Sequence, residues 1–192
     1  MNSNKNINDI LKFKIINKLK SVYRLNSVDN RKESSAEHTW SCLVLADFLL
    51  GKYKINADRL KICELLMYHD LTEIHTGDFP FVQGSDRKEK KEKELLAAKK
   101  LKKELPEQIS EKFYNLFLEF EEQKTTESKF AKAIDIFDAQ IHETDYKKDW
   151  KGWTKEFLIN NKRSECFNEF PDIKKDFLNL LDYLEEEGYF SQ

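Results

Sequence analysis

The chain has 192 residues, a length that most simply forms one domain with a sizeable core. Its 33 basic and 35 acidic residues nearly cancel, which argues against a dedicated nucleic-acid surface because such surfaces carry a basic excess. No apolar run approaches the roughly 20 residues that span a bilayer, and residues 1–8 are too polar for a signal peptide. We therefore expect a cytoplasmic protein with neither a membrane nor a nucleic-acid partner.

Composition also indicates the fold class. Only five glycines and three prolines interrupt the chain, and its apolar residues recur at helical spacing, so we predict an all-α fold, a compact helical bundle. Cys42, Cys63 and Cys166 lie far apart and form no CxxC pattern. That spacing favours reduced thiols over a disulfide or a structural zinc site.

The first predicted elements lead up to a histidine. A stripe of apolar residues at helical spacing covers residues 8–20, whereas residues 21–32 show no clean period and are predicted to form a loop. Ser34 and Glu37 then have the spacing of a capping box, in which each side chain hydrogen-bonds the backbone of the other residue. We therefore expect a helix to begin after Ser34 and to carry His38 in its first turns.

The next helix boundaries are marked by a glycine and an asparagine. The helix that contains His38 is expected to end at Gly51, and Asn56 is predicted to cap its successor. That successor is largely apolar, carries His69-Asp70 near its C-terminal end and breaks before Gly77. Further helices are predicted from Ser85 or Asp86 through Leu105, from Pro106 to about Glu122, from Thr125 or Thr126 through Ile141, and in two stretches of residues 150–192.

The stretch Met67–Asp78 is the densest group of reactive side chains, with three carboxylates and two imidazoles. A buried carboxylate must be paired, protonated or bound to a cation, so His69 and Asp70 are the first candidates for a metal site. Asp135 interrupts an apolar helix stripe and raises the same question, with an ion pair to Lys132 or a helix cap as the alternative. A lone histidine such as His38 is more often hydrogen-bonded than ligating.

Four residues nevertheless form a coherent ligand set. Two imidazoles and two carboxylates suit one divalent ion per chain, such as Mn²⁺, Co²⁺, Fe²⁺ or Mg²⁺, in roughly octahedral geometry. Such a set leaves two positions open for water or substrate, as a catalytic metal requires. The four candidates are His38, His69, Asp70 and Asp135.

Acidic and basic neighbours would complete such a site. Glu73 shares the predicted helix face of His69 and would position or deprotonate a water, while Asp78 follows a glycine that would turn it toward the same pocket. Solvation of a helix end is the alternative for both. Positive charge for a phosphate would come from Lys18, Arg24 and Arg31, and an ordinary surface position is the alternative for the two arginines. His75 and His142 are expected to be structural or solvent-facing.

These segments resemble the HD-domain metal-dependent phosphohydrolase superfamily, in the branch of the 5'-deoxynucleotidases. The resemblance covers roughly residues 12–147 and rests on Val22-Tyr23-Arg24, Arg31-Lys32-Glu33-Ser34, Glu37-His38, Tyr68-His69-Asp70-Leu71-Thr72-Glu73, Thr76-Gly77-Asp78 and Lys132-Ala133-Ile134-Asp135. It implies a single HD-type domain over residues 1–192, with its core in residues 12–147 and a helical extension, residues 148–192, packed on it.

The resemblance also assigns roles. His38, His69, Asp70 and Asp135 become the metal ligands, Glu73 handles the attacking water, and Asp78 contacts the sugar or orders that water. Where bacterial members have an Arg followed by a Trp, this chain has Lys18-Leu19. Lysine keeps the charge without the bidentate fork, and leucine cannot stack as an aromatic does, so phosphate binding is expected to rest more on Arg24 and Arg31.

The expected activity is release of phosphate from (deoxy)nucleoside 5'-monophosphates by attack of a metal-activated water. The alternatives are a phosphodiesterase or nucleoside-polyphosphate hydrolase of the same superfamily, and a nucleotide-binding regulator whose site has decayed. Relatives in this branch are often homodimers, so a homodimer is expected. The aromatic side chains that would serve either its interface or the core are Phe113, Tyr114, Phe117 and Phe120.

Overall fold

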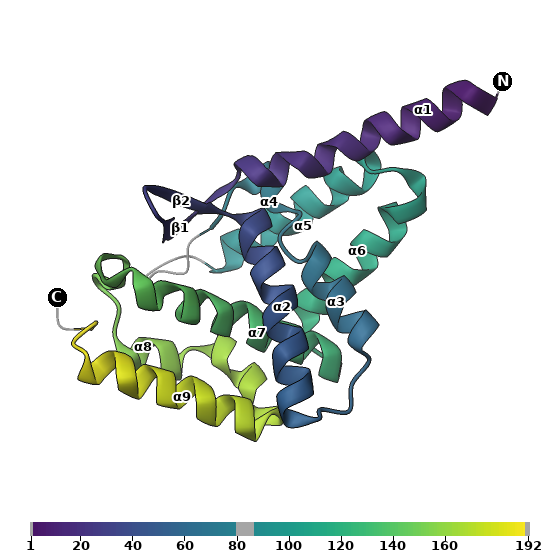
Figure 1. Cartoon of the computed structure of the whole chain (residues 1–192). Coiled ribbons are helices and arrows are strands. Elements are labelled where there is room, and N and C mark those ends of the chain that lie inside the picture. Colours follow the sequence, from purple (N-terminus) through teal and green to yellow (C-terminus); the bar gives the residue numbers. More distant parts are fainter. Residues whose placement is uncertain (1, 80–86, 191–192) are drawn as a thin grey trace.

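The computed structural model describes residues 2–79 and 87–190, and it confirms the all-α fold class (Figure 1). In these residues the sheet structure is one antiparallel pair of strands. The elements are α1 (Asn2–Phe13), η1 (Lys14–Ser21), β1 (Tyr23–Val28), β2 (Arg31–Ser34), α2 (Ser35–Tyr53), α3 (Arg59–Tyr68), α4 (Glu73–Thr76), α5 (Arg87–Glu104), α6 (Glu107–Glu122), α7 (Thr126–His142), η2 (Glu143–Asp145), η3 (Lys147–Trp150), α8 (Lys155–Asn160), η4 (Lys162–Glu169) and α9 (Pro171–Glu186), where η denotes a 3₁₀ helix.

Helix α7 forms the centre of the molecule (Figure 1). It packs against α2, α3 and α6, and η4 covers it from the C-terminal part of the chain. Every residue from Phe130 to Asp138 is therefore buried, including the polar ones. A helix surrounded in this way must find a partner for each of its carboxylates, which makes Asp135 and Asp138 informative.

Helix α2 begins where the sequence predicted. The Ser34 hydroxyl accepts a hydrogen bond from the backbone N–H of Glu37, and the Glu37 carboxylate accepts one from the backbone N–H of Ser34 at 2.9 Å. Arg31 then donates two hydrogen bonds to the same carboxylate, at 2.8 and 2.5 Å. Thr125 caps α7 in the same manner, as expected. These caps fix where the two helices that carry His38 and Asp135 begin.

The prediction of a loop over residues 21–32 is wrong, because β1 occupies residues 23–28 and pairs with β2 in an antiparallel β-hairpin. Tyr23 pairs with Ser34 and Val28 pairs with Arg31 across a turn at Asp29, which adopts a left-handed backbone conformation with φ of 50°. Aspartate and asparagine are turn-forming residues that tolerate the left-handed conformation seen at Asp29. This pair was the available signal, but the strands lack the strict alternation of apolar residues that identifies a strand.

Several helix boundaries also differ from prediction. Helix α2 continues past Gly51 to Tyr53 and ends at Lys54, which takes the left-handed conformation. Asp58 rather than Asn56 caps α3, because its carboxylate accepts a hydrogen bond from the backbone N–H of Lys61 at 3.0 Å. The predicted start at Ser85 or Asp86 lies outside the described residues, and the structure describes α5 from Arg87 onward.

The two ends of the chain depart from the predicted helices as well. Residues 8–20 divide between α1 and the 3₁₀ helix η1, and α1 projects away from the body so that Ile10 and Phe13 remain exposed (Figure 1). After η3, the chain forms three elements rather than two. Of these, η4 and α9 pack through Phe167 and Phe177, whose rings stack with centroids 4.5 Å apart. Among the residues described, no helix is both long and apolar enough to cross a membrane.

Candidate metal centre and adjoining cavity

Two buried histidines lie side by side at the centre of the molecule. His38 is in the first turn of α2 and His69 follows the last residue of α3, and their ring centroids are 5.5 Å apart. The Nδ1 atom of His69 donates a hydrogen bond to the backbone carbonyl of Leu66 at 2.7 Å, because a carbonyl oxygen can only accept. This bond leaves Nε2 as the nitrogen with a free lone pair, which is the form that binds a metal.

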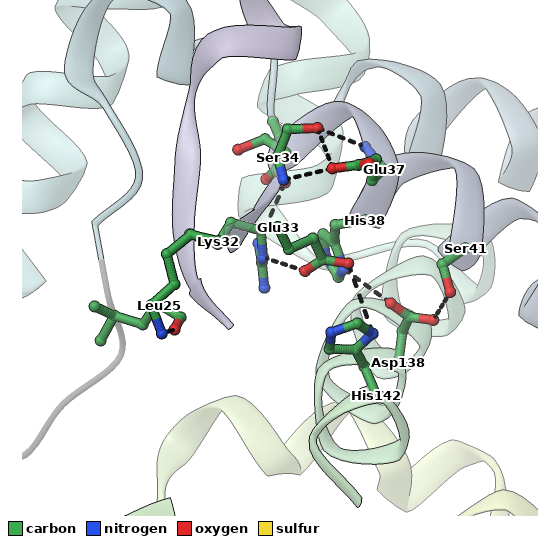
Figure 2. Close-up of polar contacts among 12 residues, drawn as sticks. Leu25, Lys32, Glu33, Ser34, Glu37, His38, Ser41, Asp138 and His142 are labelled. Atoms are coloured by element: carbon green, nitrogen blue, oxygen red, sulfur yellow. Dashed lines mark hydrogen bonds and ion pairs between the residues drawn. The ribbon is translucent and has the colours of Figure 1, made fainter. Parts of the chain in front are cut away.

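His38 is oriented by a carboxylate in the same way. Its Nδ1 atom lies 2.9 Å from Oδ2 of Asp138 on α7, and the hydroxyl of Ser41 donates a hydrogen bond to the other oxygen of Asp138 (Figure 2). Because the carboxylate accepts a hydrogen bond from Nδ1–H, the free lone pair of His38 lies on Nε2. Sequence analysis gave Asp138 no role in the site. Its spacing of three residues from Asp135 was the signal that both face the same neighbours.

Both predicted carboxylate ligands meet the free nitrogens of the histidines. Oδ2 of Asp70 lies 3.1 Å from Nε2 of His69, and Oδ1 of Asp135 lies 3.2 Å from Nε2 of His38. The structure thus brings together all four predicted ligands from α2, the end of α3 and α7. Burial alone would raise the pKa of Asp70, but the adjacent imidazoles of His69 and His38 and the guanidinium of Arg24 hold it below its usual value.

Two of these atoms lack a hydrogen-bond partner of good geometry. Nε2 of His69 and Oδ2 of Asp70 are both buried, yet neither forms a hydrogen bond with any described residue. Their 3.1 Å approach to each other is an ion-pair distance without hydrogen-bond alignment. Buried polar atoms of this kind are satisfied in nearly all proteins, and a divalent cation would satisfy both at once. The donor set therefore fits a metal ion.

The alternative partner of Asp135 is present as well. Lys132 places its ammonium group 2.7 Å from Oδ2 of Asp135 and 4.8 Å from the ring centroid of Phe120. The carboxylate thus has one oxygen toward Lys132 and the other toward His38. An ion pair through one oxygen and a metal through the other are compatible, since a carboxylate offers about four lone-pair sites.

A cysteine also adjoins the histidines, which the sequence did not lead us to expect. Nitrogen atoms of His38 and His69 and the Sγ atom of Cys42 lie within 4.8 Å of one another. The Sγ atom is 3.5 and 3.7 Å from the two ring nitrogens of His38, so it lies beside that ring. Cys42 is fully buried, and burial raises the pKa of its thiol to about 12, so the thiol keeps its proton, whereas a metal-binding cysteine is a thiolate. We therefore keep the two carboxylates, rather than the thiol, in the candidate ligand set.

His69, Asp70 and Asp135 line one end of a cavity of about 150 Å³ that is open to solvent. Its acidic and basic lining at this end is Arg24, Glu73, Asp78, Lys90, Glu94, Glu121 and Lys132, beside His69, Asp70 and Asp135. The mixture supplies both proton-transferring groups and positive charge for an anionic ligand.

Glu73 lines the cavity as expected, but a different helix places it there. Helix α3 ends at Tyr68 and a turn follows, so Glu73 begins the short helix α4 instead of sharing a helix with His69. The hydroxyl of Ser35 donates a hydrogen bond to its carboxylate at 2.6 Å. Burial, together with the nearby charges of Asp70 and Asp78, raises the pKa of Glu73 well above its ordinary value. Such a shift favours the protonated carboxyl, the form that can donate a proton.

Asp78 also lines the cavity, directly after the turn at Gly77. Gly77 has a φ of 69°, a left-handed conformation that glycine adopts without strain, and this turn brings the chain back toward the cavity. Burial raises the pKa of Asp78, and the positive charge of Arg24 opposes that shift.

The structure separates the three predicted phosphate-binding residues. Arg24, on β1, lies 3.2 Å from the Glu33 carboxylate and 3.6 Å from that of Asp70, and it lines the cavity. Arg31 instead holds Glu37 at the start of α2, and Lys18 is exposed on η1. Neither is among the described residues that line the cavity. Lys90 and Lys132 do line it, and sequence reasoning gave neither of them a substrate-binding role.

The remaining histidines take the structural roles expected. Nε2 of His75 lies 2.6 Å from the carboxylate of Glu104, and Nε2 of His142 donates to the backbone carbonyl of Ser27 at 2.6 Å. His142 also lies 3.9 Å from Glu33 (Figure 2). Both histidines are absent from the described cavity lining.

Comparison with known proteins agrees with this geometry. The fold and the site define a helical domain that carries histidine and aspartate side chains at one end of a cavity. The chain belongs to the HD domain family, whose model matches residues 16–174. The match extends beyond the predicted core of residues 12–147 into the C-terminal elements.

Individual relatives were found by sequence and by structure. The chain is 30% identical over 138 residues to the 5'-deoxynucleotidase HDDC2 of Xenopus laevis, covering 70% of this chain and 67% of that protein. It is 29% identical over 136 residues to HDDC2 of Homo sapiens, covering 69% and 65%. A crystal structure described as a predicted metal-dependent phosphohydrolase from Magnetospirillum magnetotacticum superposes with a TM-score of 0.81 at 27% identity, covering 96% and 95% of the two chains.

Proposed function

We propose that this protein is a metal-dependent phosphohydrolase that releases phosphate from 2'-deoxynucleoside 5'-monophosphates. The observation that carries the proposal is the convergence of His38, His69, Asp70 and Asp135 at one end of a cavity that also holds Arg24 and Glu73. Relatives that carry the name 5'-deoxynucleotidase support the substrate class, and the phosphohydrolase of similar structure supports the reaction class.

A bound divalent ion would neutralise negative charge on the phosphoryl group and lower the pKa of a water molecule. The two histidines present neutral nitrogens and the two aspartates present oxygens, a set that suits Mn²⁺, Co²⁺, Fe²⁺ or Mg²⁺. Asp138 and the carbonyl of Leu66 hold the histidine rings in the ligating orientation. One ion per chain is proposed.

The chain's own side chains would bind the phosphate and move the proton. Arg24 presents its guanidinium beside Asp70, and Lys132 presents an ammonium group beside Asp135, so an anionic phosphate between them would meet two positive charges. Glu73 is held by Ser35 and would exchange a proton with the attacking water or the leaving oxygen. Asp78 would contact the sugar or order that water.

The arrangement favours a monophosphate over the phosphodiesterase or polyphosphate alternative. A second metal would require further imidazoles beside the first centre. The two histidines left over are His75, which pairs with Glu104, and His142, which donates to Ser27. The decayed-regulator alternative would predict a damaged ligand set, and all four candidate positions are intact.

The experiment is phosphate release from a panel of deoxy- and ribonucleoside 5'-monophosphates. The protein is stripped of metal and reloaded separately with Mn²⁺, Co²⁺ and Mg²⁺, and Asp70→Ala is assayed beside it, with exposed Asp172→Ala as the matched control. We expect metal-dependent release that Asp70→Ala abolishes, together with its metal content, and that the control keeps. Full activity in Asp70→Ala would refute the assignment of the metal site.

We also propose that the protein forms a homodimer. Phe113, Phe117 and Phe120 are buried in the core, so they do not supply the interface. Helix α2 instead exposes Trp40, Val44 and Phe48, which recur every four residues and so share one face. Light scattering of the wild type against Phe48→Glu tests the proposal. A monomeric wild type would refute it.

A further inference from the structure

The cavity extends well beyond the metal candidates. Its far end is built from the hairpin and the C-terminal part of the chain, by residues Leu25, Asn26, Gln140, Glu143, Asp149, Trp150, Trp153, Leu158 and Asn161. Helix α7 connects the two ends, since Asp135 lies at one and Glu143 directly follows its last residue at the other. Eight residues at the helical rise separate them by about 12 Å along the axis. An extended nucleotide bound by its phosphate at Asp135 would place its base near Glu143.

Glu143 places a buried carboxyl at this end of the cavity, with the Asn26 amide beside it. The residue is 8% exposed and lines the cavity, and neither carboxyl oxygen has a hydrogen-bond partner of good geometry in the part of the chain that is described. Its backbone is fixed, because the indole N–H of Trp150 donates to the Glu143 carbonyl at 2.8 Å. A buried carboxyl without well-aligned hydrogen bonds is costly for the fold unless a ligand pairs with it.

The charges around Glu143 favour its neutral form. Burial, followed by the negative charge of Asp149, raises the pKa of Glu143 to about 8, and Glu33 adds to the shift. The amide of Asn26 and the ammonium group of Lys32 oppose it. At neutral pH the side chain therefore presents one O–H donor and one C=O acceptor side by side. Above the pKa it presents two acceptors.

Aromatic side chains border the same space. Trp150 is buried and Trp153 is half-buried, and both line the cavity with the aliphatic Leu25 and Leu158. Stacking of a base on an indole ring is favourable for every base. The pair Lys18-Leu19 cannot supply this contact, since Leu19 is buried and neither residue is among the described lining residues.

We propose that this end of the cavity is a nucleobase subsite, in which Glu143 hydrogen-bonds the edge of the base while Trp150 and Trp153 contact its faces. The inference rests on the proposed function and extends it to the way the substrate is recognised. A neutral carboxyl pairs with any adjacent hydrogen-bond donor and acceptor, and every common base offers such a pair. The subsite should therefore bind all common bases at neutral pH. Two acceptors pair best with the adjacent N1–H and N2–H groups of guanine, so ionised Glu143 favours guanine.

The test compares substrates with and without a base. Wild type, Glu143→Leu and Glu143→Gln are loaded with metal and assayed on deoxynucleoside 5'-monophosphates and on 2-deoxyribose 5-phosphate. We expect Glu143→Leu to lose about tenfold in kcat/KM on the nucleotides and to be unchanged on the base-free substrate. Glu143→Gln keeps a donor and an acceptor and should stay within about threefold of wild type. Exposed Glu156→Leu on α8 is the matched control.

A second readout distinguishes base contact from a structural effect. The ratio of kcat/KM for dGMP to that for dAMP should rise between about pH 6.5 and pH 8.5 in the wild type and stay flat in Glu143→Gln. The ratio cancels any pH dependence of the metal and of Glu73. An unchanged nucleotide kcat/KM in Glu143→Leu, or a ratio that rises equally in Glu143→Gln, would overturn the subsite.

Failure of the proposed function would look different. If the wild type hydrolyses neither the nucleotides nor 2-deoxyribose 5-phosphate with any metal, the phosphohydrolase proposal fails by itself. Calorimetric titration of the metal-free protein with deoxycytidine then decides the subsite. Binding that Glu143→Leu weakens about tenfold supports it, and no binding by the wild type overturns it.

Discussion

Asp138 should control how tightly the protein binds metal, although it is not itself a proposed ligand. Its Oδ2 atom lies 2.9 Å from Nδ1 of His38, and both side chains are almost completely buried. Asp138→Asn preserves the size of the side chain but allows its amide to donate to Nδ1. The imidazole would then carry its proton on Nε2, which faces Asp135, and that nitrogen could no longer ligate.

We expect Asp138→Asn to weaken metal affinity by about 10- to 100-fold, which corresponds to about 1.4 to 2.8 kcal/mol. Competition with a chromophoric chelator measures this on the folded protein without reference to activity. Ser41→Ala removes only the hydroxyl that donates to Asp138 and should cost less than tenfold. A folded Asp138→Asn with wild-type metal affinity would show that the His38 orientation does not depend on this carboxylate, and the reasoning would be wrong.

Two further outcomes are expected. Because the fold raises the pKa of Glu143 from 4.5 to about 8, the native state holds a proton that the unfolded chain releases, and stability falls as pH rises through this window. Urea unfolding of metal-free wild type should therefore lose about 3 kcal/mol relative to Glu143→Gln between about pH 5 and pH 7.5, and parallel curves would refute this. Arg24→Lys should raise KM about tenfold, because lysine lacks the bidentate fork of arginine. Arg31→Lys, away from the cavity, should leave KM unchanged. Equal effects of the two substitutions in steady-state assays would contradict the separation of the two arginines.

The helical architecture and the metal candidates could be predicted because their signals are local. Ser34 and Glu37 mark a helix start within four residues, and His69-Asp70 ends an apolar helix where an unpaired charge is conspicuous. The hairpin that carries Arg24 gave only a weak local signal at its turn, because its strands are stabilised by tertiary contacts. His142 donates to the backbone of Ser27, and Asp29 donates its backbone N–H to the hydroxyl of Tyr146 at 2.9 Å.

The parts of the site that were missed depend on distant pairs. His38 and Asp138 are 100 residues apart in sequence, and nothing local announces their hydrogen bond. The far end of the cavity is similar, since Glu143 and Trp153 belong to a segment without a recognisable motif. Lys18 is the opposite case. Its charge suited a phosphate, but the 3₁₀ helix η1 leaves it exposed and outside the described lining.

The continuity of α7 constrains how this protein can change. Asp135 faces the metal candidates and Glu143 follows the last residue of the same helix, so the helix fixes both the distance and the relative direction of the two side chains. One inserted or deleted residue between them would rotate one end by about 100° relative to the other. Laboratory evolution of substrate preference should therefore accept substitutions at cavity-lining positions such as Ala139 and Gln140 and reject changes of length between Asp135 and Glu143. Length variation should instead accumulate outside residues 135–153, which carry a metal candidate and the proposed base contacts.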